Sequence, residues 1–320
     1  MPCRDAEHTV GPAAQSILRQ QGIFDLRLLA VDDGSRDNTR AVLESLAEKD
    51  PRVRVVSQER RGLVAALNRG LELVQTPLIA RQDADDVSHP QRLMSQLELL
   101  GRADVVGCRI RGFPRGSVMG GMRRYERWQN RLCRHQEMQE QLYVESPLAH
   151  ATALMKTQSL KDAGGFRQLD GPEDWDLWAR MFARGRRFEK VPRLLYFWRE
   201  HEQRATRTDP RLCEDNFRAL KCTHLLSGSL KGAEQVELWS HGRQGQAWAE
   251  LLSERGSFRF FYRELNPKPV MAGRAALPRF PLDNPGMLLV AYGTESIRRW
   301  FSDKLVDLGG RSGKNYLLIG

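Results

Sequence analysis

Apolar and polar residues alternate in two periods along the first hundred residues, where short apolar runs separate helical segments. The runs have the length of buried strands and span residues 27–31, 53–56, 78–80 and 104–108. The segments between them repeat apolar residues at the spacing of a helix face and span residues 12–20, 37–46, 62–74 and 90–100. Strands that alternate with helices in this way predict an α/β fold with a doubly wound sheet.

The start of the chain is short for such a fold. Only Met1, Pro2 and Cys3 are available for a strand before the first predicted helix and the segment that leads into it. A doubly wound sheet of this kind begins with a central strand at that place, and its loss would leave the neighbouring strands without partners. We therefore expect a truncated first strand: either the chain starts inside the true gene product, or the sheet lacks that strand.

A second α/β pattern begins near residue 230. Its predicted strands span 236–239, 258–263, 287–291 and 316–319, and its predicted helices span 244–254 and 295–305. We therefore predict two domains, residues 1–228 and a smaller Rossmann-like domain over residues 229–320. Ser240-His-Gly242-Arg-Gln-Gly245 follows a strand, with Glu264 about twenty residues later, as in a degraded dinucleotide-binding fingerprint. This module favours either a structural or partner-binding role or a nucleotide site.

Composition excludes several classes of protein. Hydrophobic residues make up 41% and charged residues 28%, which is typical of a globular chain. The five cysteines are odd in number and lack CxxC spacing, which indicates reduced thiols rather than a disulfide framework or a zinc site. No stretch approaches the ~20 apolar residues of a membrane span, and no signal-peptide pattern opens the chain. We therefore expect a cytoplasmic protein.

The net charge of +10 indicates anionic partners. Because the chain has no RNP, helix-turn-helix or finger pattern, we expect no nucleic-acid partner. Residues 121–135 predict a basic amphipathic helix, in which Tyr125, Trp128 and Leu132 recur at helical spacing among arginines. The charged face is either solvated over a packed stripe or a docking surface for anionic lipid or a lipid-phosphate acceptor. The second alternative would place the protein in peripheral contact with the inner face of the membrane.

Three carboxylates stand together after a predicted strand. Asp83, Asp85 and Asp86 follow the apolar run 78–80 and precede a helical segment. Ligand sites of α/β sheets lie at the carboxyl ends of strands, and Asp83 and Asp85 are two positions apart, so both can project toward one ion. The alternative is an acidic turn that caps the helix, but a single residue would satisfy that cap. Since neighbouring carboxylates repel one another, the pattern favours a divalent-cation site.

Three acidic segments occur in order along the chain: Asp32-Asp33-Gly34-Ser35, Ala80-Arg-Gln-Asp83-Ala-Asp85-Asp86 and Glu173-Asp174-Trp175-Asp176-Leu177-Trp178. In order and spacing they resemble family 2 glycosyltransferases of the GT-A fold. The resemblance runs from Met1 to about His201, and three motifs in register are more specific than any one alone. It implies a GT-A type doubly wound mixed sheet, a Mg²⁺ or Mn²⁺ cofactor, and a role in polysaccharide biosynthesis for the cell envelope.

The resemblance implies roles on the donor side of the site. Asp33 resembles the acid that hydrogen-bonds the nucleotide base, with an Asx-turn residue as the alternative. Pro2 lies in a segment that resembles the family's first-strand exit, which implies contact with the donor nucleotide. Asp83 and Asp85 resemble the DXD pair, with Asp85 as the direct metal ligand and Asp83 nearer the ribose. Leu67 stands where the family usually has an arginine, which puts one donor contact in doubt.

The resemblance also implies roles for residues near the acceptor and near the diphosphate of the donor. Asp174 resembles the general base of inverting members, and the alternative is an acid that favours the start of a helix. Its neighbours Glu173 and Trp175, together with His150, are candidates for contact with the acceptor or for support of the catalytic groups. His201 matches a family position near the diphosphate and is a candidate metal ligand, with a surface histidine as the alternative.

We therefore expect an inverting, metal-dependent glycosyltransferase that moves a sugar from a nucleotide-diphosphate sugar, first of all a UDP-sugar, to a hydroxyl of a glycan or lipid-linked acceptor. Two alternatives stay open. A truncated or inactive chain would bind the nucleotide-sugar as a scaffold, which the short start favours and the intact acidic motifs oppose. A nucleotidyltransferase shares the α/β plan, but it would have a glycine-rich basic loop after its first strand, which residues 1–10 lack.

Overall fold

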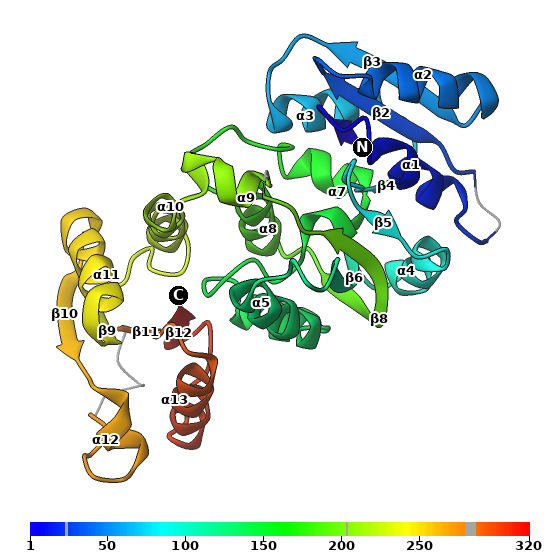
Figure 1. The fold of residues 1–320 in the computed structure, drawn as a ribbon. Helices are drawn as coiled ribbons and strands as arrows, with labels where there is room; N and C mark the ends of the chain where they lie inside the picture. The colour runs from blue at the N-terminus through cyan, green and yellow to red at the C-terminus, as the bar shows by residue number, and fades with distance from the viewer. Residues whose placement is uncertain (23–24, 203, 279–285) are drawn as a thin grey trace. The chain divides into compact units, whose positions relative to one another are not determined.

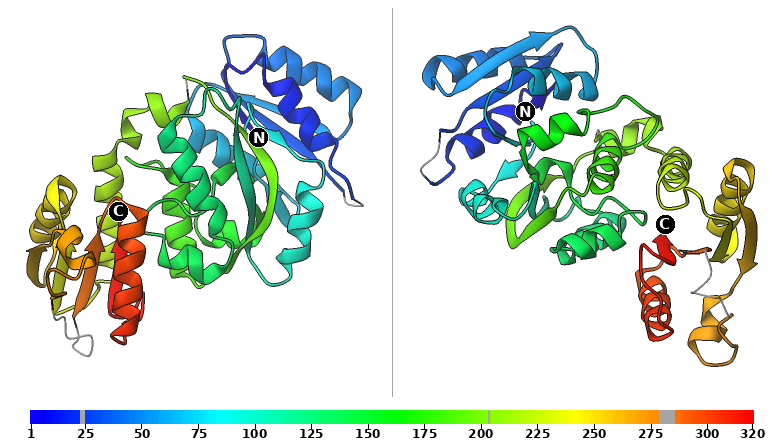
Figure 2. Two further views of the ribbon diagram at one scale, coloured as in Figure 1. Left: turned by 60° about the horizontal axis from the view of Figure 1, so that its bottom comes forward. Right: turned by 180° about the vertical axis from the view of Figure 1, so that it is seen from behind.

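The computed structural model describes residues 1–22, 25–202, 204–278 and 286–320. Contacts divide the chain into two compact units. The first unit comprises Met1–Met138 and Ser146–Pro210, and the second comprises Gln139–Glu145 and Arg211–Gly320. In Figures 1 and 2 the first unit runs from blue to green, and most of the second runs from yellow-green to red.

Three parallel strands form the first sheet, in the order β1 (Pro2–Cys3), β2 (Leu28–Asp33) and β3 (Val53–Gln58). The helices that follow these strands are α1 (Val10–Leu18), α2 (Thr39–Lys49) and α3 (Leu63–Leu73). The first strand is present and spans two residues, with Pro2 opposite Val31. Ala14 and Ile17 of α1 pack with Leu28 and Val53 in one apolar cluster, as the helical spacing predicts.

A mixed five-stranded sheet forms the rest of the first unit. Its strand order is β4 (Leu78–Ala80), β7 (Leu154–Lys156), β6 (Val105–Phe113), β8 (Phe188–Arg199) and β5 (Val87–Ser88). Strands β6 and β8 are parallel, whereas β7 pairs antiparallel with both β4 and β6. The order brings the end of β4 and the long strand β8 into one sheet, although more than a hundred residues separate them in sequence.

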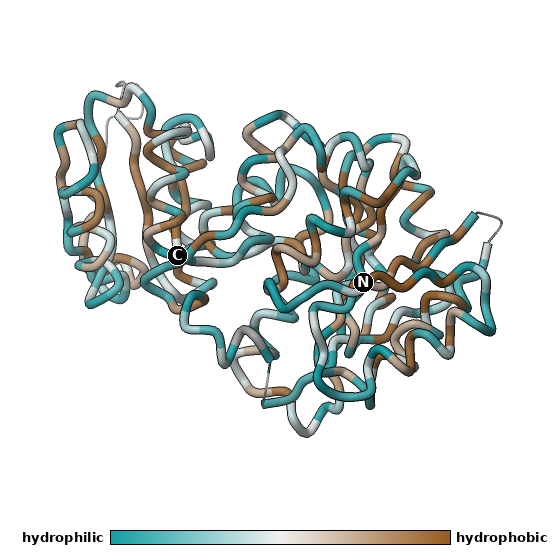
Figure 3. Tube along the Cα trace, turned by 90° about the horizontal axis from the view of Figure 1, so that it is seen from above, coloured by the Kyte–Doolittle hydropathy of each residue, from teal (hydrophilic) through white to brown (hydrophobic). Residues whose placement is uncertain are grey.

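Helices cover this second sheet. They are α4 (Arg92–Leu100), α5 (Gly120–Arg131), α6 (His135–Glu140), α7 (Thr157–Asp162), α8 (Glu173–Ala183) and α9 (Ala205–Thr208). Cys108 and Ile110 of β6 pack with Leu195 and Tyr196 of β8 in the core beneath them. In Figure 3 the strands carry longer hydrophobic stretches than the helices, because both faces of the sheet are covered.

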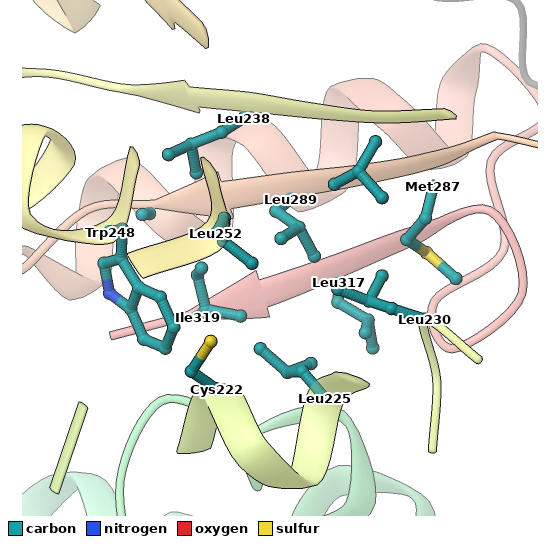
Figure 4. Packing of buried hydrophobic residues seen from close by; sticks show 12 residues of the cluster. Cys222, Leu225, Leu230, Leu238, Trp248, Leu252, Met287, Leu289, Leu317 and Ile319 are labelled. Atoms are coloured by element: carbon teal, nitrogen blue, oxygen red, sulfur yellow. The ribbon is translucent and has the colours of Figure 1, made fainter. Parts of the chain in front are cut away.

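Four parallel strands form the sheet of the second unit, in the order β10 (Arg259–Glu264), β9 (Gln235–Ser240), β11 (Met287–Ala291) and β12 (Tyr316–Ile319). Its helices are α10 (Glu214–Ser227), α11 (Gly242–Arg255), α12 (Pro267–Met271) and α13 (Glu295–Asp307). Figure 4 shows the apolar core, in which Cys222 and Leu225 of α10 face Trp248 and Ile319. The predicted Rossmann-like strand pattern is confirmed. The unit also contains α10 and Gln139–Glu145, which lie before residue 229.

Among the helices within the described ranges, none has both the length and the apolar character required to cross a membrane.

Candidate functional site

Asp33 ends β2 and holds the loop that leads into α3. Its carboxylate accepts hydrogen bonds from the Gln58 side chain at 2.7 Å and from the backbone N–H groups of Arg61 and Gly62, both at 2.8 Å. Gly34 follows with a φ of 68°, and a Cβ there would lie 2.8 Å from the backbone nitrogen of Arg60. Only glycine therefore allows β2 to turn this closely past the loop.

Asp83 follows β4 and is paired with a buried arginine. The Arg81 guanidinium donates to Asp83 Oδ1 at 2.6 Å, and the Asp83 backbone N–H donates to the Tyr196 hydroxyl at 3.2 Å. Burial alone would raise the pKa of Asp83, but the charge and hydrogen bond of Arg81 outweigh burial and hold that pKa below its usual value. Asp83 is therefore ionised at neutral pH.

Asp85 lies beside the end of β8. Its Oδ2 atom is 2.9 Å from His201 Nε2, and its backbone carbonyl accepts a hydrogen bond of 2.7 Å from the Arg199 side chain. Both Asp85 and His201 keep about a third of their side-chain surface exposed. The pair is therefore accessible to a ligand, and both side chains can offer an atom to the same cation.

Asp86 is the buried member of the cluster. Its Oδ1 atom accepts a hydrogen bond of 2.7 Å from the Arg199 backbone N–H, whereas its buried Oδ2 atom has no hydrogen-bond partner among the described residues. Burial raises the pKa of Asp86 well above its usual value, and the charges of Asp83 and Asp85 raise it further. The carboxyl of Asp86 therefore favours its protonated form in this environment.

The three carboxylates fit a divalent cation. One oxygen from each of Asp83, Asp85 and Asp86 can be chosen so that all three lie within 4.8 Å of one another. Carboxylate oxygens are the ligands that Mg²⁺ prefers. The buried Oδ2 atom of Asp86 has no hydrogen-bond donor among the described residues, so a cation could serve as its partner. A cation at this cluster would also offset the repulsion that raises the pKa of Asp86.

His150 and Glu173 form a second, more buried pair. His150 Nδ1 lies 3.4 Å from Glu173 Oε1, and the imidazole packs against Phe166 and Trp178. Burial lowers the pKa of His150, so the ring is neutral at pH 7. Burial alone would raise the pKa of Glu173, but the hydrogen bond with His150 lowers it. Arg81 acts electrostatically on both groups and links this pair to the carboxylate cluster.

Asp174 lies in the first turn of α8, directly after Glu173. Its Oδ1 atom accepts a hydrogen bond of 2.7 Å from the Trp175 backbone N–H, and its Oδ2 atom accepts one of 3.3 Å from the Ser146 hydroxyl. These donors fix the orientation of the carboxylate. The Trp175 side chain is fully buried and anchors α8 in the core. Its indole therefore supports the helix from inside the protein.

The structure brings Asp83, Asp85 and His201 together, and Arg81 links them to the pair of His150 and Glu173. Pro2 lies on β1 and is half-buried, next to β2, which ends at Asp33. Sequence reasoning missed three cations near the carboxylates, namely Arg81, Arg199 and Arg204. Only Arg81 had a signal in the sequence, as a charged residue directly after an apolar strand.

A model for the family described as Glycosyl transferase family 2 matches residues 1–164, about half of the chain. EpsE of Bacillus subtilis, which is named as a glycosyltransferase, is 29% identical over 61% of this chain and 70% of its own length. The succinoglycan biosynthesis protein ExoO of Rhizobium meliloti is 37% identical over 32% of this chain and 28% of its own length. The chain thus spans 70% of the length of EpsE but only 28% of the length of ExoO.

Two solved structures share the fold at low sequence identity. Residues 1–349 of TarS from S. aureus, crystallised with UDP-GlcNAc, superpose with a TM-score of 0.59 over 81% of this chain and 72% of that 1–349 fragment, at 19% identity. The mannosyltransferase PcManGT from Pyrobaculum calidifontis, in complex with GDP-Man and Mn²⁺, gives a TM-score of 0.50 over 72% of this chain and 61% of its own, at 20% identity.

Proposed function

This chain belongs to glycosyl transferase family 2, and we propose that it transfers a sugar from a nucleotide-diphosphate sugar to a hydroxyl group with inversion at the sugar carbon. The observation that carries the proposal is the carboxylate cluster of Asp83, Asp85 and Asp86, joined through Arg81 to the start of the helix that bears Asp174. The GT-A type fold, similar to that of TarS, supports it.

The donor in this proposal is a UDP-sugar, and the acceptor is a glycan or a lipid-linked sugar. TarS was crystallised with UDP-GlcNAc, which favours UDP as the donor nucleotide. The complex of PcManGT with GDP-Man makes GDP the competing alternative. Relatives named for succinoglycan and amylovoran biosynthesis favour a polysaccharide acceptor. Asp33 would contact the nucleotide, because it lies at the carboxyl end of β2, where such sheets bind ligands, and Pro2 would contact it from the short neighbouring strand β1.

Asp83, Asp85 and Asp86 would hold Mg²⁺ or Mn²⁺, with His201 beside Asp85 as a further ligand. The bound cation would supply neutralisation of the diphosphate as it leaves. Arg204, whose guanidinium stacks 3.9 Å over the Trp198 ring, adds positive charge on the same side of the cluster. Arg81 keeps Asp83 ionised and thus available as a ligand or as a hydrogen-bond acceptor for the ribose.

Asp174 would act as the general base that takes the proton from the acceptor hydroxyl. The hydrogen bonds from Trp175 N–H and the Ser146 hydroxyl orient its carboxylate, which positioned proton transfer requires. Glu173 and His150 would position the start of α8 relative to the donor site, and Trp175 would anchor the helix. Removal of the base should lower turnover by about 10²–10⁴-fold.

The test measures release of nucleoside diphosphate from a panel of donor sugars, with Mn²⁺, with Mg²⁺ and with EDTA. We expect turnover by the wild type only with a cation, and loss of turnover in Asp85→Ala and Asp174→Asn. Glu98→Ala, which removes an exposed carboxylate of α4, is the matched control and should keep full activity.

Turnover in EDTA, or full activity of Asp85→Ala, would overturn the metal site. Full activity of Asp174→Asn would overturn the base. Binding of a UDP-sugar by the wild type without any turnover would favour a scaffold instead of an enzyme. The anomeric configuration of the product, read by NMR, decides between inversion and retention.

A further inference from the structure

Helix α5, whose place in the fold is shown in Figure 1, carries a row of exposed arginines. We call this row the arginine face, and its members are Arg123, Arg124, Arg127 and Arg131, all exposed. Their spacing of three and four residues places them on one side of the helix. The opposite side buries Glu126, Trp128 and Gln129 against the protein. The helix is therefore amphipathic by charge, with a packed side and a purely cationic side.

The protein itself engages this face only in part: the Arg123 guanidinium donates to the Val118 and Arg115 carbonyls. Glu126 is the only acid in α5, and it is turned inward, where it pairs with Arg115 at 2.9 Å and accepts from the Gly112 N–H at 2.9 Å. Among the described residues, no hydrogen bond or ion pair engages the guanidinium of Arg124 or Arg127. Like charges three or four positions apart destabilise a helix, so an anionic partner would relieve this repulsion.

An exposed apolar side chain adjoins the arginine face. Met119, directly before the helix, is 64% exposed, the most exposed large hydrophobic residue among those described. Gly120 and Gly121 follow it and are also exposed, so no side chain covers it from that direction. A soluble polyanion would make no use of an apolar side chain. Arginines around an exposed methionine match an interfacial helix, in which cations contact lipid headgroups and apolar groups enter the acyl boundary.

We propose that the arginine face and Met119 dock the protein on an anionic membrane surface. This inference goes beyond sugar transfer and does not depend on it, since neither Met119 nor the arginine face belongs to the carboxylate cluster. Docking would hold the enzyme at the bilayer, where a lipid-linked acceptor is concentrated. The attraction is electrostatic in its larger part and should fall as salt screens it.

Sedimentation of the full chain with phosphatidylcholine vesicles, with and without phosphatidylglycerol, tests the proposal. We expect binding only to the anionic vesicles, and a loss of about tenfold or more in affinity in Arg124→Glu/Arg127→Glu. Arg54→Glu/Arg259→Glu is the matched control, because it makes the same change in net charge at two exposed arginines elsewhere. It should bind as the wild type does.

Two further variants separate the possible causes of lost binding. Arg124→Gln/Arg127→Gln removes the charges while keeping good helix formers, so a fall in binding with an unchanged melting temperature excludes misfolding. Met119→Ser leaves the net charge unchanged. It should weaken binding to anionic vesicles but not binding to a soluble polyanion such as polyphosphate. Donor hydrolysis without acceptor should be unchanged in all these variants, which keeps this test separate from that of sugar transfer.

Equal binding to neutral and anionic vesicles would overturn the proposal. So would full vesicle binding by Arg124→Glu/Arg127→Glu, or an equal loss in the control variant. Binding to polyphosphate without binding to anionic vesicles would show that the arginine face recognises a soluble polyanion instead.

Discussion

Asp83 and Asp86 are three positions apart, yet their surroundings move their pKa values in opposite directions. Asp83 faces the buried guanidinium of Arg81, which lowers its pKa although burial opposes this. Asp86 is buried with one oxygen unpartnered, and its pKa is raised by burial and by the other carboxylates. The acidic motif thus combines an ionised ligand with a carboxyl that a cation would bring to its charged form.

A buried lysine provides a test that does not involve the reaction. Lys190 Nζ on β8 donates to Gln129 O at 2.6 Å, to Gln129 Oε1 at 2.9 Å and to Pro147 O at 3.0 Å, and no carboxylate in the described part of the chain pairs with it. Burial lowers the pKa of Lys190 to about 7. In the unfolded chain the pKa returns to about 10.4, so the unfolded state binds more protons between these values.

We therefore expect the Lys190 contribution to the free energy of unfolding to increase with pH, by up to roughly 1.4 kcal/mol per pH unit above neutrality. Urea unfolding of the wild type and of Lys190→Met at about pH 7 and about pH 9 measures it. Lys221, whose pKa burial lowers to about 8, acts equally in both proteins and cancels. The same pH dependence in both proteins would contradict the prediction.

Strands and helices with regular apolar spacing could be predicted from the sequence, and others could not. The run 78–80 is β4, and the run 27–31 overlaps β2 from Leu28 onward, because both carry consecutive apolar residues. The first half of strand β8 has no such pattern, since it includes Lys190 and Arg193, although Leu194–Trp198 in its second half are consecutive apolar residues. Local periodicity does not reveal a strand segment in which a lysine is buried through hydrogen bonds to distant segments, as Lys190 is.

The same reason limits prediction of the site. Asp83 and Asp85 could be placed at the end of a strand, because their position follows from β4. The contacts of Asp85 with His201 and Arg199 could not, because they depend on a residue pairing across more than a hundred positions. The predicted roles of Asp33, Asp174 and the other candidates stay predictions until variants are assayed.

One hydrogen-bonded pair connects α3 to the segment after α7. The Asn68 side chain donates from Nδ2 to Phe166 O at 2.8 Å and accepts at Oδ1 from Phe166 N at 3.0 Å. We expect Asn68→Ala to lower the free energy of unfolding by about 1–3 kcal/mol, because both backbone groups of Phe166 lose their partner. Arg69→Ala, at an exposed neighbouring position, should change stability by less than about 0.5 kcal/mol. Denaturant unfolding compares them, and equal effects would exclude this role of Asn68.

Across the chain, stability is divided between two sets of core residues. The core of the second unit contains Leu225, which is fully buried with Leu238 and Leu252 (Figure 4). We expect Leu225→Ala to destabilise that unit by about 2–5 kcal/mol. Calorimetry should then show a transition shifted to lower temperature, while diphosphate release below that temperature stays at the wild-type rate. Leu226→Ala, at a half-buried neighbour, is the control and should cost less. If Leu225→Ala lost diphosphate release together with the shift of its calorimetric transition, the division of stability between two sets of core residues would be contradicted.

Residues Gln139–Glu145 belong to the second unit, although the first unit surrounds them in sequence. Inside the second unit, the Lys221 ammonium donates to Val144 O at 2.8 Å, and the Gly320 N–H donates to Tyr143 O at 3.0 Å. The C-terminal module is therefore not a simple appendage of the chain. A gene fusion that exchanged this module at one junction would leave seven of its residues behind, so a functional exchange requires three junctions, one on each side of the 139–145 segment and one near residue 211.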